Sequence, residues 1–426
     1  MKAIIMAGGK GTRLKSVTGD EIPKPLALVN GKPILQWQIE CLKANGITEI
    51  LIVVGYLGEK IKAYFGEKYQ YFTEETPLGT AGALSFLSDF IGDDDFFLVF
   101  GDTVFDIDLK YMHDYHKSKS AKATLFAHPN SHPYDSDLII VNADDKVLRF
   151  DSKSNIRNYW YENLVNAGLY VLSPSVLDTI KCSEKTDLEK QVLSKMSDVC
   201  AYRSSEYIKD AGTPERIKAI ENDLKTGVVS AKNRKTKQIC VFLDRDGTIN
   251  KYKGLIYKPE DIELEDVAAE AIKALNQSKF LTAIVTNQPS IARGLCNIED
   301  IVECNKKLVT TLGEKGAYVD DFEFCPHHPD SGYPEENPIF KVKCSCRKPN
   351  IGMIHKIAER HNVDLSKSWI IGDTTRDIQT GINAGMSTIL VKTGEAGNDG
   401  AFEVTPDFTF DNLLQAIEEP LNFYKS

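Results

Sequence analysis

The sequence predicts an α/β protein with two domains, each an open sheet in a three-layer αβα arrangement. Its length of 426 residues favours two or three domains. Short apolar segments alternate with amphipathic ones in both halves, which is typical of α/β domains. A basic stretch without apolar periodicity, 231–237, lies between the halves. We therefore predict domains at 1–230 and 238–426 joined by an exposed linker, although a helix end with a solvated basic face would also explain this stretch.

The composition narrows the classes of function. Hydrophobic residues make up 42% of the chain, and the formal net charge of −10 argues against nucleic acid or an anionic membrane as a general partner. No apolar run approaches the roughly 20 residues of a membrane span. The nine cysteines are an odd number and mostly scattered, so we expect a reducing, cytoplasmic location. The sequence leaves open whether the protein forms an oligomer.

A glycine-rich turn follows the first predicted strand. The strand spans 2–7, and the turn reads Gly8-Gly9-Lys10-Gly11-Thr12-Arg13-Leu14. Glycines let the backbone approach a triphosphate and direct N–H groups at it, but a flexible turn explains such a motif equally well on its own. Pro23-Lys24-Pro25-Leu26 follows, and its prolines hold Lys24 in a defined position. This cation makes phosphate binding the better interpretation.

The other elements of the first half continue the α/β pattern. Amphipathic helices are expected at 33–45 and 214–226, and strands at 49–54 and 96–100. The sequence Leu78-Gly79-Thr80-Ala81-Gly82-Ala83 is expected to open a helix. Because helix N-termini attract anions, this segment is a candidate for binding a phosphate or a base edge.

Two aspartates complete the pattern. Asp102 follows the strand at 96–100, and open α/β sheets bind ligands at the carboxyl ends of their strands. Asp210 lies in the sequence Asp-Ala-Gly-Thr-Pro. Either aspartate alone is as readily a turn or a helix cap. Together with the Gly-rich and Pro-Lys-Pro-Leu motifs, however, they make this half resemble the sugar-1-phosphate nucleotidyltransferase family.

The resemblance implies transfer of a nucleotide from a nucleoside triphosphate to a sugar 1-phosphate, without a covalent enzyme intermediate. It implies catalytic roles for Arg13 and Lys24 and magnesium ligation by Asp102 and Asp210. The nucleotide-binding residues that it implies are Gly8, Gly9, Gly11, Thr12 and Gly79, and the sugar-binding residues are Lys153 and Asn166.

Two positions depart from the family pattern on the sugar side. Ser152 stands where the family has a glutamate before the lysine, and Asp137 stands where it has a glycine. Nucleotide transfer is still expected, but the usual preference for a hexose is not.

The second half opens with an apolar strand, 241–243, which leads into Asp244-Arg245-Asp246-Gly247-Thr248. Alternate residues of a strand share a face, so Asp244 and Asp246 can both address one metal or phosphate. An acidic pair alone is more often a solvated surface feature. Here it follows a buried type of strand, and further polar motifs come after it in the chain.

Three more motifs follow in order. Thr286-Asn287 ends a strand, Arg347-Lys348 supplies cations, and Asp373 ends another strand with Asp377 one helical turn later. This order makes the half resemble the haloacid dehalogenase-type phosphatases. The resemblance implies that Asp244 is the nucleophile and Asp246 the acid and base. It also implies that Asp244, the Asp246 carbonyl and Asp373 hold Mg²⁺, and that the phosphate-binding residues are Thr286, Asn287, Arg347 and Lys348.

A cysteine-rich loop separates the second and third of these motifs. Cys325-Pro-His327 and Cys344-Ser-Cys346 supply four ligands suited to tetrahedral zinc, although two unrelated cysteine pairs remain the alternative. Such a loop resembles that of the heptose 1,7-bisphosphate 7-phosphatases and the related histidinol-phosphate phosphatases. With no open position, this zinc would be structural. His328 is expected to be a structural neighbour, and Pro289-Ser290 departs from the family's Ser-Gly beside the substrate.

The two halves imply consecutive reactions, because a phosphatase that makes heptose 1-phosphate would supply a transferase that consumes it. We expect a bifunctional enzyme whose small-molecule substrates are GTP and heptose phosphates. The alternative is a mannose-1-phosphate guanylyltransferase joined to a phosphatase of other specificity, such as one for histidinol phosphate. A regulator that binds sugar phosphates without turnover is disfavoured by the intact Asp244, Asp246, Lys348 and Asp373.

Overall fold

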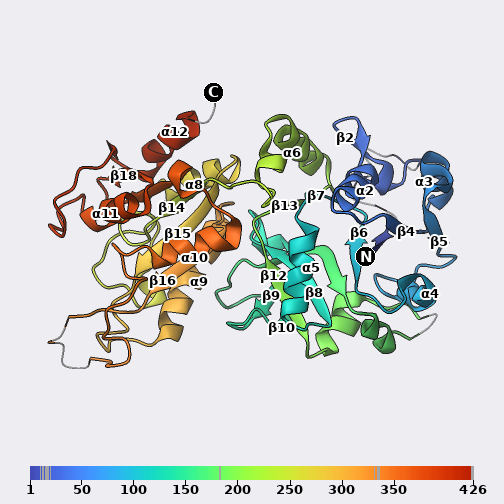
Figure 1. Cartoon of the computed structure of the whole chain (residues 1–426), viewed down its shortest axis with the longest axis horizontal. Helices are drawn as coiled ribbons and strands as arrows, with labels where there is room; N and C mark the ends of the chain where they lie inside the picture. The colour runs from blue at the N-terminus through green and yellow to red at the C-terminus, as the bar shows by residue number, and fades with distance from the viewer. Residues whose placement is uncertain are drawn as a thin grey trace. The chain divides into compact units, whose positions relative to one another are not determined.

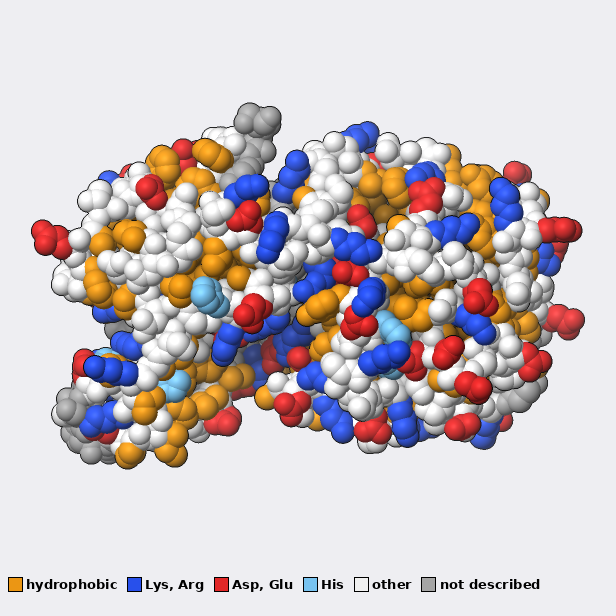
Figure 2. Space-filling view, viewed as in Figure 1, with side chains coloured by type: hydrophobic (Ala, Val, Ile, Leu, Met, Phe, Trp, Pro, Cys, Tyr) orange, Lys and Arg blue, Asp and Glu red, His pale blue; other side chains and the backbone are white. Residues whose placement is uncertain are grey.

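The computed structural model describes residues 1–9, 11, 14, 19, 21–181, 184–330, 332 and 336–423. The chain forms two compact units (Figure 1). Unit 1 comprises Met1–His128, Asp137–Ser152 and Val165–Asn233, and unit 2 comprises Pro129–Ser136, Lys153–Leu164 and Arg234–Ser426. Acidic and basic side chains are interspersed over the faces seen in Figure 2. Within the described ranges, no helix is both long and apolar enough to cross a membrane.

Unit 1 is built on a mixed nine-stranded sheet. Its centre is β1 (Lys2–Met6), which pairs in parallel with β4 (Glu49–Val54) and β6 (Phe96–Phe100). The other strands are β5 (Gln70–Thr73), β8 (Ala123–His128), β9 (Leu138–Val141), β10 (Val147–Asp151), β11 (Val165–Leu172) and β12 (Val199–Arg203). Two small sheets pair β2 (Leu28–Val29) with β3 (Lys32–Pro33) and β7 (Thr103–Asp106) with β13 (Tyr207–Asp210).

Helices cover one face of this sheet through a shared apolar core. The core contains Leu35 and Ile39 of α2 (Ile34–Ala44), Ile61 of α3 (Gly58–Phe65) and Met112 of α5 (Leu109–Ser118). The other α-helices in the described part of the unit are α4 (Ser88–Ile91), α6 (Pro214–Lys225) and α7 (Val228–Ala231). The strands expected at 2–7, 49–54 and 96–100 and the helices expected at 33–45 and 214–226 are present to within a residue at most ends.

The helix expected to open at 78–83 is not formed. Gly79 has a φ of +82°, and the chain enters only a 3₁₀ turn, Gly82–Phe86. A Cβ on Gly79 would lie 2.5 Å from the carbonyl oxygen of Thr186. The glycines here therefore serve close packing of two backbone segments, and a left-handed residue cannot continue a helix.

Unit 2 is built on a six-stranded parallel sheet in the order β16-β15-β14-β17-β18-β19. The strands are β14 (Cys240–Leu243), β15 (Leu281–Asn287), β16 (Asp321–Cys325), β17 (Trp369–Gly372), β18 (Ser387–Val391) and β19 (Phe408–Phe410). One face packs on α8 (Ala268–Asn276), α9 (Ile298–Glu314) and α12 (Leu413–Phe423). The other packs on α10 (Gly352–His361), and α11 (Thr375–Ala384) lies against β17 and β18. The predicted α/β fold with two domains is thus confirmed.

Two short segments from the first half of the sequence belong to unit 2. The Thr310 hydroxyl of α9 accepts a hydrogen bond from the backbone N–H of Tyr161 (3.0 Å) and donates one to its carbonyl (3.2 Å). Gly313 of α9 leaves no room for a Cβ, because that atom would lie 2.5 Å from Pro133. In the sequence, these two segments lie between strands of unit 1, so unit 2 is not continuous along the chain.

The linker itself is only partly exposed. Lys232 and Asn233 are buried, and Asn233 donates a 2.6 Å hydrogen bond to Asp106 within unit 1. The exposed part is 235–237. The predicted boundary at 231–237 therefore stays a prediction, with its first residues packed into unit 1.

Candidate active sites

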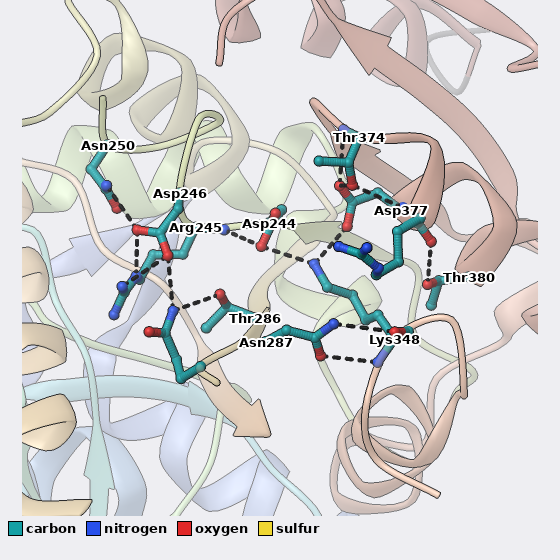
Figure 3. Close-up of polar contacts among 12 residues, drawn as sticks. Asp244, Arg245, Asp246, Asn250, Thr286, Asn287, Lys348, Thr374, Asp377 and Thr380 are labelled. Atoms are coloured by element: carbon teal, nitrogen blue, oxygen red, sulfur yellow. Dashed lines mark hydrogen bonds and ion pairs between the residues drawn. The ribbon is translucent and has the colours of Figure 1, made fainter. Parts of the chain in front are cut away.

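The phosphatase-type site lies at the carboxyl ends of the central strands of unit 2 (Figure 3). Asp244 directly follows β14, and Asp373 directly follows β17. The buried ammonium of Lys348 joins the site: its Nζ lies 2.8 Å from Asp244 Oδ1 and 2.5 Å from Asp377 Oδ1. The parallel sheet thus brings together charged groups that are more than a hundred residues apart in the sequence.

The start of α11 fixes Asp377. Thr374 caps this helix, and Asp377 Oδ2 accepts hydrogen bonds from the Thr374 backbone N–H (3.2 Å) and hydroxyl (2.6 Å). This capping box leaves Oδ1 for Lys348. The sequence placed Asp377 near the magnesium site, and the structure gives it the distinct role of holding Lys348 against Asp244.

Burial dominates the electrostatics of this cluster. Burial, followed by the nearby Asp377 carboxylate, raises the pKa of Asp244 to about 6. Burial, followed by Asp244 and Asp377, raises the pKa of Asp373 to about 8. Burial alone would lower the pKa of Lys348, but the two bonded carboxylates outweigh it and raise that pKa. The site therefore concentrates negative charge that a single lysine does not balance.

The surplus negative charge fits a divalent cation. Oxygens of Asp244, Asp373 and Asp377 lie within 4.8 Å of one another, and in the described part of the chain the buried Asp373 Oδ1 has no hydrogen-bond partner. Asp373 Oδ2 accepts a 2.7 Å bond from the Glu395 N–H. Both oxygens of Asp377 are bonded, Oδ1 to Lys348 and Oδ2 to Thr374, whereas among the described residues the hydrogen bonds and the ion pair of Asp244 all fall on its Oδ1. Asp244 and Asp373 are therefore the carboxylates with an oxygen left to hold a metal. Hard oxygen donors of this kind suit Mg²⁺.

The Asp246 carboxylate makes a separate set of contacts from those of Asp244, Lys348 and Asp377. Its carboxylate accepts two hydrogen bonds from the fully buried guanidinium of Arg245, at 3.0 and 2.9 Å, and others from Asn250 (3.0 Å) and Gln288 (2.8 Å). Gln288 also donates to the Thr286 hydroxyl (3.0 Å). The sequence did not identify Arg245 or Gln288 as site residues. The only feature of the sequence that could have indicated Arg245 as a site residue is its position between Asp244 and Asp246.

Two residues predicted to bind phosphate make contacts within the protein. Asn287 accepts a 3.0 Å hydrogen bond from the Lys348 N–H and donates one of 3.1 Å to the Lys348 carbonyl. Its amide therefore positions the Lys348 backbone. Arg347 donates a 3.0 Å bond to the carbonyl of His327. Phosphate binding by Asn287 and Arg347 stays a prediction.

The four residues predicted to bind zinc converge. Cys346 Sγ lies 3.2 Å from both Cys325 Sγ and Cys344 Sγ, and 3.3 Å from His327 Nδ1. Cys325 Sγ lies 3.6 Å from His327 Nδ1 and 3.6 Å from Cys344 Sγ. The described cysteines are free thiols. These three sulfurs and one imidazole nitrogen lie within 4.8 Å of one another, and such a donor set is of the kind that holds a metal in tetrahedral coordination.

Positive charge gathers beside this loop. Burial, followed by the charge of Arg347 and then of Arg293 and Arg376, lowers the pKa of the buried His328. Burial, followed by Arg376, lowers the pKa of Arg347 itself. The Asp330 carboxylate, whose Oδ2 lies 3.7 Å from His328 Nε2, acts on His328 in the opposite direction, so the basic groups here are only partly balanced.

The second site is a cavity of about 390 Å³ in unit 1. The described residues that line it are Met6, Ala7, Gly8, Gly9, Gly11, Leu14, Lys24, Pro25, Glu74, Pro77, Gly79, Thr80, Phe100, Gly101, Asp102 and Gly212. The predicted nucleotide-binding glycines thus face one space with the predicted catalytic lysine. Thr12 and Arg13, like Lys10, lie outside the described residues.

Lys24 bridges the two aspartates predicted to bind magnesium. Its Nζ lies 2.7 Å from Asp102 Oδ2 and 3.4 Å from Asp210 Oδ1, and Arg216 also pairs with Asp210. Both carboxylates remain about one-third exposed, at 35% and 31%. One oxygen of each carboxylate contacts Lys24, Asp102 lines the cavity, and both carboxylates are partly accessible, so the pair fits a hydrated Mg²⁺. Arg216 was missed at the sequence level, although it lies on the helix that Thr213 caps.

Glu74 is a further cavity residue that the sequence did not reveal. Its Oε1 accepts a 3.1 Å hydrogen bond from the Leu78 N–H, and a Cβ on Gly8 would lie 2.5 Å from its Oε2. Burial raises its pKa. Gly8 is therefore needed so that the carboxylate can lie against the backbone. The only feature of the sequence that could have indicated Glu74 is that an acidic residue stands four positions before Leu78.

The two predicted sugar-binding residues fall in different units. Lys153 belongs to unit 2, where it pairs with Asp135 at 2.9 Å. Asn166 lies in β11 of unit 1 and donates to Glu189 (2.7 Å) and to the Tyr170 hydroxyl (2.8 Å). Their shared role stays a prediction.

Comparison with known proteins gives a match for each half. Residues 2–226 match the Nucleotidyl transferase family, and residues 345–416 match the HAD-hydrolase-like family. A D-glycero-beta-D-manno-heptose-1,7-bisphosphate 7-phosphatase of Yersinia pestis is 35% identical over 157 residues, which cover 37% of this chain and 81% of that protein.

The first half has a relative of similar closeness. A D-glycero-alpha-D-manno-heptose 1-phosphate guanylyltransferase of Aneurinibacillus thermoaerophilus is 31% identical over 232 residues, which cover 53% of this chain and 98% of that protein. Among solved structures, a D,D-heptose 1,7-bisphosphate phosphatase from B. bronchiseptica is 31% identical with a TM-score of 0.39, and the match covers 44% of this chain and 99% of that one.

Proposed function

Because this chain belongs to the nucleotidyl transferase family and, through its second half, to that of the heptose bisphosphate 7-phosphatases, we propose that it converts a heptose 1,7-bisphosphate into a nucleotide-activated heptose. The phosphatase removes the 7-phosphate, and the transferase joins the resulting heptose 1-phosphate to GMP from GTP. One observation supports this pairing most: the predicted catalytic groups of both reactions stand in one chain, and a phosphatase that releases a heptose 1-phosphate supplies a transferase that consumes it. We also propose a cytoplasmic location, because GTP and sugar phosphates are available there.

The phosphatase chemistry follows from the contacts of Asp244. Its carboxylate, held by Lys348, attacks the 7-phosphorus and forms an aspartyl phosphate while the sugar alkoxide leaves. Asp246 supplies the proton to that alkoxide and then takes one from the water that releases phosphate. Asp244 and Asp373 would hold Mg²⁺, which neutralises charge between the carboxylate and the phosphoryl group. The Thr286 hydroxyl and Lys348 bind the phosphoryl oxygens.

The arginines favour a substrate with a second anionic group. Arg293, Arg347 and Arg376 act on His328 from around the cysteine loop. A bisphosphate carries its remaining phosphate to such a region, whereas histidinol phosphate presents a cationic amine there. Zn²⁺ held by the Cys–His cluster would be structural, because the four protein ligands leave it no open coordination position. Arg347 donates a hydrogen bond to the carbonyl of His327, so the same cluster would help to fix that arginine.

The transferase chemistry requires positioning more than covalent catalysis. An oxygen of heptose 1-phosphate attacks the α-phosphorus of GTP, and pyrophosphate leaves. Lys24 binds the phosphate oxygens, while Asp102 and Asp210 would hold Mg²⁺, which neutralises the triphosphate. Guanine presents adjacent N1–H and N2–H donors, and the Glu74 carboxylate is an acceptor suited to that pair. This supports GTP among the nucleoside triphosphates.

Removal of the 7-phosphate keeps the configuration at carbon 1, so both sites must use the same anomer. The direct test therefore offers the intact protein the α and, separately, the β anomer of D-glycero-D-manno-heptose 1,7-bisphosphate with each of the four nucleoside triphosphates. We expect GDP-heptose, inorganic phosphate and pyrophosphate in equal amounts with GTP. Histidinol phosphate and mannose 1-phosphate serve as competitors. Faster phosphate release from histidinol phosphate, or preferred transfer to mannose 1-phosphate, would contradict the proposal.

A further inference from the structure

The loop that follows β18, residues 393–397, packs directly on Asp373, and the proposed reactions leave it without a role. The Glu395 N–H donates a 2.7 Å hydrogen bond to Asp373 Oδ2, and the Gly397 N–H donates one of 2.7 Å to the Asp373 carbonyl. The other carboxylate oxygen, Oδ1, is buried and has no hydrogen-bond partner among the residues that the structure describes. The loop therefore orients Asp373 so that Oδ1 is the oxygen available to a cation.

Thr393 connects this loop to the turn that carries the nucleophile, residues 244–250 (the nucleophile turn). Its hydroxyl donates a 2.6 Å hydrogen bond to the Gly247 carbonyl, and the Gly247 N–H donates one of 2.7 Å to the Asn250 carbonyl. Because a trans peptide directs its N–H and C=O to opposite sides, the second bond also sets the direction of the Asp246 carbonyl, a predicted magnesium ligand. Thr393 thus holds one of the two peptide groups of Gly247, and Asn250 holds the other.

Close packing makes this arrangement sensitive to small displacements. A Cβ on Gly394 would collide with Asp373 Oδ2 and lie 2.7 Å from Gly247 Cα, and a Cβ on Gly247 would collide with the same carboxylate oxygen. Both glycines have a positive φ, +55° and +84°. The loop, the nucleophile turn and Asp373 are therefore in close contact, so a shift between them moves predicted metal ligands.

Both ends of the loop are fixed by other elements of unit 2. The Lys392 N–H donates a 2.9 Å hydrogen bond to the Phe410 carbonyl of β19. Asp399 Oδ1 accepts one of 2.7 Å from the Thr375 N–H at the start of α11. The sheet and α11 thus set the position from which Thr393 acts.

We propose that Thr393 is a positioning residue of the phosphatase. Its hydrogen bond keeps the nucleophile turn against the loop, so that the predicted metal-binding oxygens of Asp244, Asp246 and Asp373 are in place before a cation binds. Ligands that are already arranged bind a metal more tightly, and removal of a group that orients them typically lowers metal affinity by about 10- to 100-fold. The inference rests on the proposed phosphatase chemistry, because only that reaction uses these ligands.

The test measures cation affinity in the absence of substrate. Mn²⁺, which shares the oxygen ligands of Mg²⁺, is titrated into the full chain, and the free ion is followed by electron paramagnetic resonance. Every protein also carries Asp102→Asn and Asp210→Asn, so that the transferase site does not contribute. We expect Thr393→Val to raise the Kd for Mn²⁺ by at least about tenfold, whereas Thr393→Ser, which keeps the hydroxyl, should stay within about threefold. Adding Asp373→Asn should abolish the binding, which identifies the site.

Thr388→Val is the matched control. Thr388 is a buried threonine of β18 whose hydroxyl donates a 2.9 Å hydrogen bond to Asp407, which is not one of the predicted metal ligands. Its loss should lower stability without changing the Kd for Mn²⁺. A less stable variant contains fewer binding sites, but each remaining site keeps its Kd, so a folding defect does not imitate the expected result.

The outcomes separate this inference from the function on which it rests. An unchanged Kd in Thr393→Val, or equal rises in Thr393→Val and Thr388→Val, would overturn it. Failure of the intact chain to release phosphate from heptose 1,7-bisphosphate with Mg²⁺ present would instead contradict the proposed phosphatase activity, whatever the Kd values. In the active enzyme, the Mg²⁺ concentration for half-maximal phosphate release should rise in Thr393→Val, and a fall in kcat alone at every Mg²⁺ concentration would count against the inference.

Discussion

The two sites differ in how deeply their charged side chains are buried and in how closely they are paired with one another. In the phosphatase site, Asp244, Lys348 and Asp377 are buried and in direct contact, and the pKa values of Asp244 and Asp373 are raised. In the transferase site, Lys24 pairs with two carboxylates that are about one-third exposed beside a cavity of about 390 Å³.

The difference follows from the size of what each site must hold. A phosphoryl group is small, so a parallel sheet can surround it with strand ends and a pre-assembled ion cluster. A nucleoside triphosphate and a sugar phosphate are large, so the transferase keeps an open cavity and its ligands supply many of the contacts. We therefore expect single changes to have larger effects in the phosphatase site.

The largest effect is expected for Asp244→Asn. The variant keeps the shape of the side chain but loses the nucleophilic charge, so phosphate release from heptose 1,7-bisphosphate should fall by at least about 10³-fold. Transfer of GMP to heptose 1-phosphate should be unchanged. Phosphate release at more than about a tenth of the intact rate would rule out Asp244 as the nucleophile.

Lys24→Met should affect only the other site. Loss of one cation from the triphosphate should lower the rate of nucleotide transfer by about 10² to 10³-fold. Phosphate release by the same preparation is the internal control. A parallel loss of both activities in folded protein would show that the two sites are not independent.

Zinc removal should again distinguish the sites. Cys346→Ser should lower the zinc content to below one equivalent and slow phosphate release at least about tenfold, because Arg347 and Lys348 directly follow this ligand. Cys296→Ser changes a thiol outside the cluster and serves as the matched control. Full zinc content in the Cys346 variant, measured by elemental analysis, would exclude this ligand set.

The smallest effect is expected for Glu74→Gln. Loss of the charge weakens the hydrogen bonds offered to guanine N1–H and N2–H, so kcat/KM for GTP should fall by about tenfold or somewhat more. The kcat/KM for CTP or UTP should fall less than the kcat/KM for GTP. Equal losses for all four nucleotides would mean that Glu74 supports the cavity wall without contacting the base.

The sequence predicted the parts of the fold that depend on local pattern. Strands such as 96–100 and the order of the phosphatase motifs need only apolar runs and their polar ends, so these were found to within a residue or so. The Cys–His cluster was likewise predicted, because ligand types and spacing restrict tetrahedral sites so strongly.

Contacts that depend on the tertiary structure were not predictable. Gly79 suggested a helix N-terminus, but its backbone conformation is set by packing against Thr186, far along the chain. Glu189 carries no motif, and its hydrogen bonds to Asn166 and Tyr170 of β11 arise only from the tertiary structure. Asn287 suggested a phosphate ligand, yet its amide bonds to the Lys348 backbone, a partner 61 positions away.

The most direct test of the central claim uses the Asp244→Asn variant with two alternative substrates. Given heptose 1,7-bisphosphate and GTP, it should form no nucleotide-linked sugar, because the transferase requires the product of the blocked phosphatase. Given heptose 1-phosphate and GTP, it should form GDP-heptose at close to the intact rate, as followed by phosphorus NMR. A nucleotide-linked heptose that still carries its 7-phosphate would contradict the proposed order of the two reactions.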